Sequence, residues 1–193
     1  DGAMQQGILY ESMNMAALWK LPVVFCCINN QYGMGTKIDD AVAVKDFSLR
    51  AKSFGLECLH VNHLDAEKAY TDIREIVDNT RNNKPSFIEV ECYRFYGHAR
   101  KDKSPYRNED EEIENRKLDP IAFAKENILR QNILNEEEIK GIDMTVDKEM
   151  DVSMNYAINS PLNEEAEIFT DVYDKRYTIE SVDSRINNIL KNK

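Results

Sequence analysis

Short apolar runs alternate with longer amphipathic stretches over the first ninety residues. The runs are rich in β-branched and other apolar residues, which predicts strands at residues 23–28, 58–61 and 87–92. The amphipathic stretches have helical spacing, which predicts helices at residues 6–19, 46–54 and 66–81. This alternation is typical of an α/β fold built on a parallel sheet.

The pattern also predicts which faces are buried. The first and third apolar runs are almost continuous at their centres, so helices are expected to cover both of their faces. The helix at residues 6–19 carries one apolar stripe at helical spacing, which we expect to face the core: Ile8, Met15, Leu18 and Trp19.

The pattern changes after residue 107, where the chain becomes acidic and helical. Helices are predicted to begin at Asn108, at Asp119 with Pro120, and at Asn135, the last continuing to about residue 159. We therefore expect an α/β domain at residues 1–107 and a helical C-terminal extension at residues 108–193. Three strands are few for a parallel sheet, so we expect an N-terminal part of the sheet to lie outside this sequence.

Charge and composition exclude some partners. The chain has 25 basic and 35 acidic residues, a net charge of −10, which opposes binding to nucleic acid and to anionic membranes. No apolar run approaches the roughly 20 residues of a membrane span. The cysteines, Cys26, Cys27, Cys58 and Cys92, lack metal or redox spacing, so we expect buried free thiols in a reducing, intracellular compartment.

Two short polar segments are candidates for chemistry. Asp1, Gly2 and Ala3 precede the first predicted helix, where a carboxylate can hold a divalent cation and free amides can receive a phosphate. The segment NNQYGMGT, residues 29–36, follows the first strand at the edge where α/β proteins bind ligands. Taken alone, each segment is better explained by an ordinary polar turn.

Their combination is more specific. The order is an acidic residue with Gly, a helix, a strand and then Asn-Asn, with 26 residues between Gly2 and Asn29. This resembles the diphosphate-binding motif of thiamine-diphosphate enzymes. The likeness extends through DGAMQQGILYESMNMAALWKLPVVFCCINNQYGMGT, YRFYGHARKD, SPYR and LDPIAFAKENIL. Over essentially its whole length the chain resembles the α subunits of two-component 2-oxo acid dehydrogenases.

The resemblance implies a parallel-sheet thiamine-diphosphate fold and a set of site residues. It implies that Asp1, Asn30 and the backbone carbonyl of Tyr32 bind Mg²⁺, while Gly2 and Ala3 offer amides to thiamine diphosphate. His98 corresponds to the family histidine that approaches the cofactor and the reacting acyl group, and its loop is locally basic, with Arg94, Arg100, Lys101 and Arg107 nearby. Such a patch can attract an anion.

The activity implied is thiamine-diphosphate-dependent oxidative decarboxylation of pyruvate or a related 2-oxo acid, with acyl transfer to lipoamide. Implied partners are a β subunit in an α₂β₂ heterotetramer, a lipoyl domain and an acyltransferase core, in bacterial cytoplasm or an organelle matrix. Acetoin cleavage and a non-catalytic fragment remain alternatives. Ile28 replaces the Glu or Arg of many relatives, and Ala99 replaces a phosphorylated serine, leaving Ser104 as a weak regulatory candidate.

Overall fold

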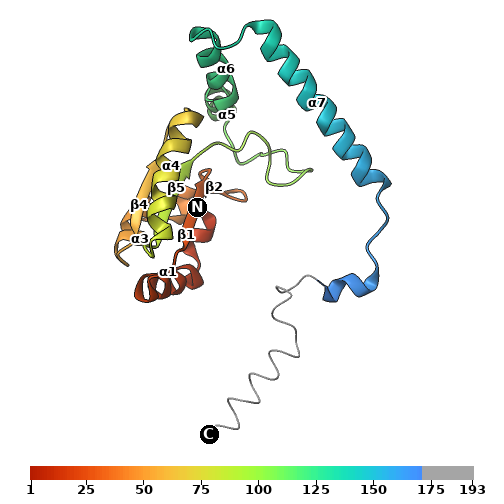
Figure 1. Ribbon diagram of the computed structural model, residues 1–193. Helices are drawn as coiled ribbons and strands as arrows, with labels where there is room; N and C mark the ends of the chain where they lie inside the picture. Colours follow the sequence, from red (N-terminus) through yellow and green to blue (C-terminus); the bar gives the residue numbers. More distant parts are fainter. Residues whose placement is uncertain (171–193) are drawn as a thin grey trace. The chain divides into compact units, whose positions relative to one another are not determined.

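The computed structural model describes residues 1–170 (Figure 1). The described chain divides into two compact units, Asp1–Glu136 and a second that begins at Glu137. In the first unit the helical elements are η1 (Gly2–Gln5), α1 (Gly7–Trp19), α2 (Ile38–Ala41), α3 (Phe47–Lys52), α4 (Ala66–Arg81), α5 (Glu109–Arg116) and α6 (Pro120–Arg130). Its strands are β1 (Val24–Asn29), β2 (Tyr32–Gly33), β3 (Thr36–Lys37), β4 (Glu57–Val61) and β5 (Ser86–Glu91). The α/β fold predicted from the sequence is confirmed.

The main sheet is parallel and has the order β1-β5-β4. The register pairs Cys27 with Glu89 and Glu89 with His60, so these residues form one row across the three strands. Because parallel strands end at the same edge, the segments that follow Asn29 and Glu91 leave the sheet side by side.

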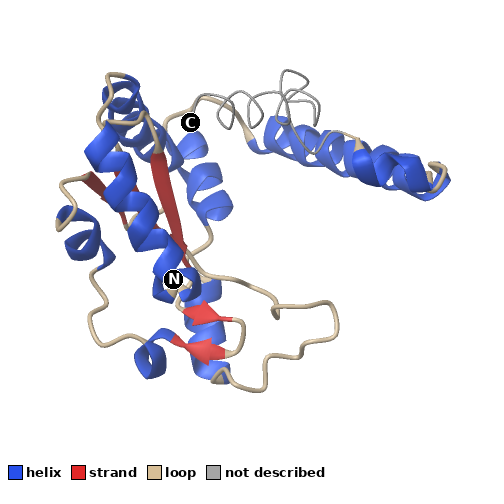
Figure 2. Cartoon of the chain, turned by 90° about the horizontal axis from the view of Figure 1, so that it is seen from below, coloured by secondary structure: helices blue, strands red, loops and turns tan. Residues whose placement is uncertain are grey.

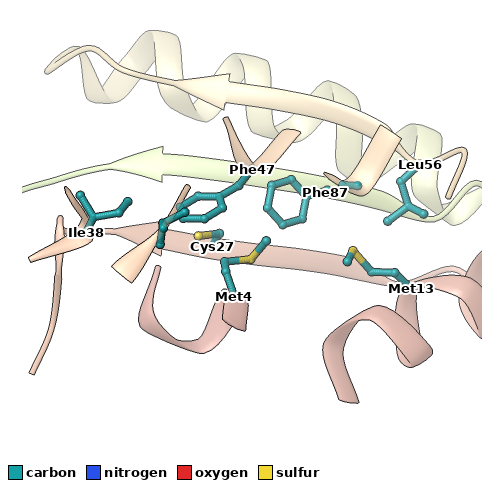
Figure 3. Close-up of a cluster of buried hydrophobic side chains, with 9 residues drawn as sticks. Met4, Met13, Cys27, Ile38, Phe47, Leu56 and Phe87 are labelled. Carbon is teal, nitrogen blue, oxygen red and sulfur yellow. The ribbon is translucent and has the colours of Figure 1, made fainter. Parts of the chain in front are cut away.

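Two helical layers cover the sheet. On one face a buried cluster joins α1, α3 and the sheet, with Met13, Phe47 and Phe87 almost fully enclosed (Figure 3). On the other face α4 packs on β4 and β5 and buries Ile76, while Ile88 is buried in the middle strand. β5 is therefore covered on both sides, as predicted.

Two predictions about burial are wrong for the described residues. In β1, Cys27 is buried but Ile28 is 53% exposed, because α4 covers only the neighbouring strands on that face. The apolar stripe expected to face the core from α1 points outward instead, and Leu18 is 71% exposed. The helix packs through Met13 and Ala16, which lie on a different face of it.

The cysteines are free, as expected, but only Cys27 is fully buried, and Cys26 and Cys92 are exposed. Burial raises the pKa of the Cys27 thiol, which disfavours its reactive thiolate form. The expectation of uniformly buried thiols is therefore wrong, because Cys26 lies on the uncovered face of β1.

Beyond the first unit, α7 (Glu136–Asn159) ends just before Pro161, as predicted, and the short η2 (Glu165–Phe169) follows. No side chain of α7 is buried. The first compact unit ends at Glu136, whereas the sequence analysis placed a domain boundary between residues 107 and 108. That boundary stays a prediction. Residues 171–193 of the predicted extension lie outside the described part. No described helix combines the length and apolar character needed to cross a bilayer.

Candidate functional site

Two loops leave the carboxyl edge of the sheet and carry three of the six predicted site residues, Asn30, Tyr32 and His98. We call residues 30–37, which follow β1 and include the β2–β3 hairpin, the β1 loop. We call residues 92–108, which follow β5, the β5 loop. The hairpin of the β1 loop lies beside the N-terminus (Figure 2).

The two adjacent asparagines have different roles. Asn29 is only 2% exposed, and its amide Nδ2 donates to Glu89 Oε1 at 2.8 Å. Its Oδ1 accepts from both the backbone and the side-chain amide of Gln31. Asn30 is half-buried, and its Oδ1 accepts one hydrogen bond, from the Tyr32 amide at 3.1 Å. An amide oxygen has a second lone pair, so Asn30 is the asparagine that can bind a ligand.

The β1 loop reverses direction through strained backbone. Gln31 and Met34 have φ of 68° and 56°, the left-handed region that non-glycine residues rarely adopt. The Ile38 amide closes the hairpin by donating to the Gln31 carbonyl at 2.9 Å. Such strain persists where the surrounding structure enforces it, and ligand sites are frequent places for it.

The two halves of the motif meet through a pair of glycines. A Cβ atom on Gly2 would lie 3.1 Å from the Gly33 Cα, and one on Gly33 would lie 3.3 Å from the Gly2 Cα. Any side chain here would push the two segments apart. A cavity of about 240 Å³ lies at this junction and is lined in part by Asp1, Gly2 and Gly33.

The segment after Asp1 forms a short turn that precedes the predicted helix. Residues 2–5 form the 3₁₀ turn η1, and α1 begins only at Gly7. The first hydrogen bond of the turn runs from the Met4 amide to the Asp1 carbonyl, so the amides of Gly2 and Ala3 have no acceptor within the turn. The Asp1 side chain makes no capping hydrogen bond. The carboxylate and both amides fit a bound metal and diphosphate.

The side chain of Tyr32 is engaged in a hydrogen bond and cannot bind a ligand. Its hydroxyl donates to the Glu111 carboxylate at 2.8 Å, and Tyr32 is 3% exposed. Burial first, and then the contact with Glu111, raise the pKa of Tyr32 to about 12. Only the backbone carbonyl of this residue is left as a possible metal ligand, in agreement with the role that the resemblance implies.

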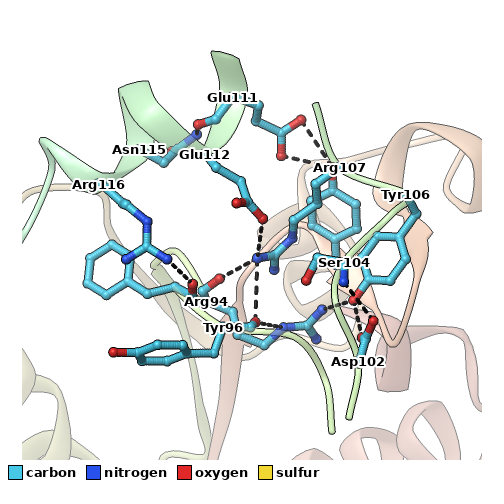
Figure 4. A network of polar contacts seen from close by, with 12 residues as sticks. Arg94, Tyr96, Asp102, Ser104, Tyr106, Arg107, Glu111, Glu112, Asn115 and Arg116 are labelled. Carbon is cyan, nitrogen blue, oxygen red and sulfur yellow. Dashed lines mark hydrogen bonds and ion pairs between the residues drawn. The ribbon is translucent and has the colours of Figure 1, made fainter. Parts of the chain in front are cut away.

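The β5 loop has no helix or strand and is organised around Asp102 (Figure 4). The Asp102 carboxylate accepts from the Tyr106 hydroxyl at 2.6 Å and from the amides of Ser104 and His98. These three bonds, the Tyr106 bond most strongly, lower the pKa of Asp102 to about 2. A Cβ atom on Gly97 would lie 2.2 Å from the Asp102 carbonyl oxygen, so this turn requires glycine.

His98 is exposed, and its backbone amide is held by Asp102. The loop that carries it packs on the β1 loop, because Arg94 donates to the Met34 carbonyl at 2.8 Å and the Tyr106 ring lies against Gly35. Within the described residues, no hydrogen bond joins the His98 imidazole to the other predicted site residues. The structure thus brings the two loops together while the imidazole remains free to approach a ligand.

Arg107 has a role that the sequence did not indicate. Its side chain is fully buried, and its Nη1 donates to the Arg94 carbonyl at 2.6 Å. Its guanidinium lies 5.0 Å from the Tyr32 ring centre and 4.9 Å from that of Tyr93. Arg107 therefore cannot meet an anion as part of the predicted basic patch. The only indication of this role in the sequence is the position of Arg107, just before the acidic first turn of α5.

Ser104 is also placed differently from the expectation. It is 8% exposed, has φ of 56°, and its amide donates to Asp102. A kinase would have to unfold this turn to reach the hydroxyl, so the structure gives no support to regulation at Ser104.

A larger cavity, about 570 Å³, lies at the same edge of the sheet and contains none of the predicted site residues. It is bordered by Val61, His63, Glu91 and Tyr93, among others. The smaller cavity is the better candidate for the predicted chemistry, because Asp1 and the junction of Gly2 with Gly33 line it.

Comparison with known proteins places these residues in a family context. A family model described as "Dehydrogenase E1 component" matches residues 1–165. The chain is 36% identical over 174 residues to the pyruvate dehydrogenase E1 component subunit alpha of Rickettsia bellii, covering 90% of this chain and 53% of that protein. It is 38% identical over 164 residues to the testis-specific mitochondrial form of the same subunit from Rattus norvegicus. That alignment covers 83% of this chain and 41% of the rat protein.

The chain thus spans about half the length of the curated relatives it matches. Among solved structures, transketolase from Campylobacter jejuni aligns with 47% of this chain and 14% of its own, at 25% identity and a TM-score of 0.41. That score is too low to support an argument.

Proposed function

Because the chain belongs to the dehydrogenase E1 component family, we propose that it forms part of the α subunit of a pyruvate dehydrogenase and contributes half of a thiamine diphosphate site. The reaction is the oxidative decarboxylation of pyruvate, with transfer of the acyl group to lipoamide. Support for this substrate comes from the relatives, which are named as pyruvate dehydrogenase subunits.

The metal half of the site consists of oxygen ligands. The Asp1 carboxylate, the Asn30 side-chain oxygen and the Tyr32 carbonyl hold Mg²⁺, which prefers oxygen donors. The Gly2 and Ala3 amides bind the diphosphate. The observation that carries the proposal is the contact between Gly2 and Gly33, since it brings the two halves of the motif together without a side chain between them.

The β5 loop supplies His98, to which we assign proton transfer. When bound, thiamine diphosphate supplies the electron sink for decarboxylation. His98 positions the reacting acyl group and exchanges a proton through its imidazole, while Asp102 holds the backbone on which the imidazole is carried. Arg94 and Tyr106 keep this loop on the β1 loop.

A β subunit completes the site, in an α₂β₂ heterotetramer that delivers acyl groups to the lipoyl domain of an acyltransferase core. The helical extension contributes α7 to the surface that partner subunits contact. Support comes from α7, which carries exposed apolar residues at helical spacing, among them Ile142, Val146 and Met150. Such an enzyme works in bacterial cytoplasm or in an organelle matrix.

Calorimetric titration of the assembled α and β subunits with thiamine diphosphate and Mg²⁺ tests the proposal. Wild-type enzyme should bind the cofactor, and Asn30→Ala should lose measurable Mg²⁺-dependent binding, since it removes one metal ligand. Asn82→Ala, at the exposed end of α4, is the matched control and should bind normally. Wild-type affinity in Asn30→Ala would contradict the metal assignment, and no binding by wild type would favour the non-catalytic alternative.

A further inference from the structure

A second group of possible metal ligands lies on the main sheet, apart from the Mg²⁺ residues. His60 of β4 and Glu89 and Glu91 of β5 each offer one ligand atom, and the three atoms lie within 4.8 Å of one another. His60 is paired with Glu89 across the strands, and Glu91 follows two residues later. Side chains two residues apart point to the same face of a strand, so all three project from one face.

Glu89 is a buried carboxyl group without an ion-pair partner among the described residues. It is only 3% exposed, and it accepts a hydrogen bond from the Asn29 side-chain amide at 2.8 Å. Within residues 1–170, no lysine, arginine or histidine nitrogen forms an ion pair with it at 4 Å or less. Burying an ionised carboxylate is unfavourable unless a cation compensates it, so this position favours a positive charge nearby.

We propose that His60, Glu89 and Glu91 bind a divalent first-row transition metal such as Zn²⁺. One imidazole nitrogen and two carboxylate oxygens suit such ions, whereas Mg²⁺ prefers oxygen ligands alone. His60 Nε2 and Glu91 Oε1 lie 2.8 Å apart, and the metal replaces this direct contact by coordinating both atoms. The side chains of His60 and Glu91 are 42% and 46% exposed, which leaves the ion a route in and room for water ligands.

The hydrogen bond from Asn29 gives the site its supporting contact. Asn29 Nδ2 fixes one oxygen of Glu89 and leaves the other for the metal, the arrangement usual for carboxylate ligands in proteins. The ion ties β4, an end strand of the described sheet, to β5. It also stiffens the start of the β1 loop through Asn29. The site uses no Mg²⁺ ligand, so its failure would leave the proposed function intact.

The competing explanation is an ordinary ion pair between His60 and Glu91 on the surface, with Glu89 held by Asn29 alone. Exposed pairs of this kind contribute little to stability, and this explanation requires no metal. The two explanations differ in what happens when Zn²⁺ is added to protein freed of metal by chelation.

Calorimetric titration of the full chain with Zn²⁺ distinguishes them. We expect one Zn²⁺ per chain, binding that excess Mg²⁺ does not displace, and an affinity lowered by at least about 10-fold in His60→Ala and in Glu91→Gln. His63→Ala is the matched control, because His63 lies three residues away and outside the cluster, and it should bind like wild type. Circular dichroism of each variant checks that the fold is retained.

Substitution of Co²⁺ for Zn²⁺ identifies the donor atoms. Visible absorption bands without a near-ultraviolet thiolate band would support nitrogen and oxygen ligands. A thiolate band would instead assign the ion to exposed Cys26 or Cys92 and overturn the proposal. It would equally be overturned if wild type bound no Zn²⁺, or if His60→Ala and Glu91→Gln bound as tightly as wild type.

Discussion

The two loops at the candidate site are held in place by different forces. The β1 loop is a backbone hairpin whose Tyr32 is buried and whose base is fixed to the sheet through Asn29 and Glu89. The β5 loop has no regular secondary structure between residues 92 and 108 and is held by side-chain contacts of Arg94, Asp102 and Arg107.

This difference bears on function because each loop carries a different part of the proposed chemistry. The β1 loop carries two of the three proposed metal ligands, Asn30 and the Tyr32 carbonyl, which need fixed positions. The β5 loop carries His98, whose place depends on a few charged and polar groups. We therefore expect the metal site to tolerate changes of pH and charge that displace His98, and the following substitutions test that contrast.

The largest effect is expected for His98→Ala in the assembled enzyme. Removing a proton-transfer group lowers rates by about 100- to 10,000-fold, so acyl transfer to lipoamide should fall by this order while thiamine diphosphate affinity stays unchanged. Steady-state kinetics and calorimetry measure the two quantities separately. His63→Ala is the control, and an unchanged rate in His98→Ala would show that the histidine is only structural.

Arg107→Met should cause the largest loss of stability, because Arg107 joins the two loops. Its buried guanidinium lies over Tyr32 of one loop and bonds to the Arg94 carbonyl of the other, with Glu112 at 3.7 Å. Loss of the charged hydrogen bond to the Arg94 carbonyl, with the contact to the partly exposed Glu112, should cost about 2 kcal/mol in free energy of unfolding.

Chemical denaturation measures this cost for Arg107→Met. Arg74→Met, on the exposed face of α4, is the control and should change stability by less than about 0.5 kcal/mol. A cost as small for Arg107 as for Arg74 would mean that the loops are joined by other contacts.

Asp102→Asn should loosen the β5 loop and leave the β1 loop as it is. Three donors lower the pKa of Asp102 from 3.8 to about 2, so its contribution is present above pH 3.8 and is lost as the pH falls toward 2. At neutral pH, hydrogen exchange should be faster at the His98 and Ser104 amides of the variant. Wild type should acquire the same exchange pattern only in the acid range.

The Ile38 amide, which closes the β1 hairpin, provides an internal reference for that experiment. Equal acceleration at Ile38 would indicate general unfolding and would remove the proposed contrast between the loops. Asp110→Asn, at the exposed start of α5, is a matched control.

The smallest effect is expected for Tyr32→Phe, which removes a hydroxyl but keeps the ring and the backbone carbonyl. Loss of the hydrogen bond to Glu111 should cost about 1 kcal/mol, with Mg²⁺-dependent cofactor affinity unchanged. The pKa of Tyr32 is raised from 10 to about 12, so wild type should lose this contribution between pH 10 and 12, and the variant should not. Weaker cofactor binding would show that the side chain acts on the site.

Most local structure could be predicted from the sequence, because it depends on local rules. Apolar runs and helical spacing predicted all three strands of the main sheet and the helices that cross between them. The helix N-caps could also be predicted. The side chains of Asp119 and Asn108 accept hydrogen bonds from backbone amides at the starts of α6 and α5. The motif spacing predicted that Gly2 and the segment after Asn29 would meet, and the glycine contact confirms it.

The sequence by itself therefore determined the elements, the α/β class and the residue types available to hold a metal and a diphosphate. Only the tertiary structure decided that α1 packs through Met13 rather than Leu18, and that Asn29 is locked while Asn30 stays available. It also decided that Arg107 is enclosed by tyrosines. The physical reason is that burial and pairing depend on neighbours distant in the chain, whereas helix and strand periodicity depends on residues a few positions apart.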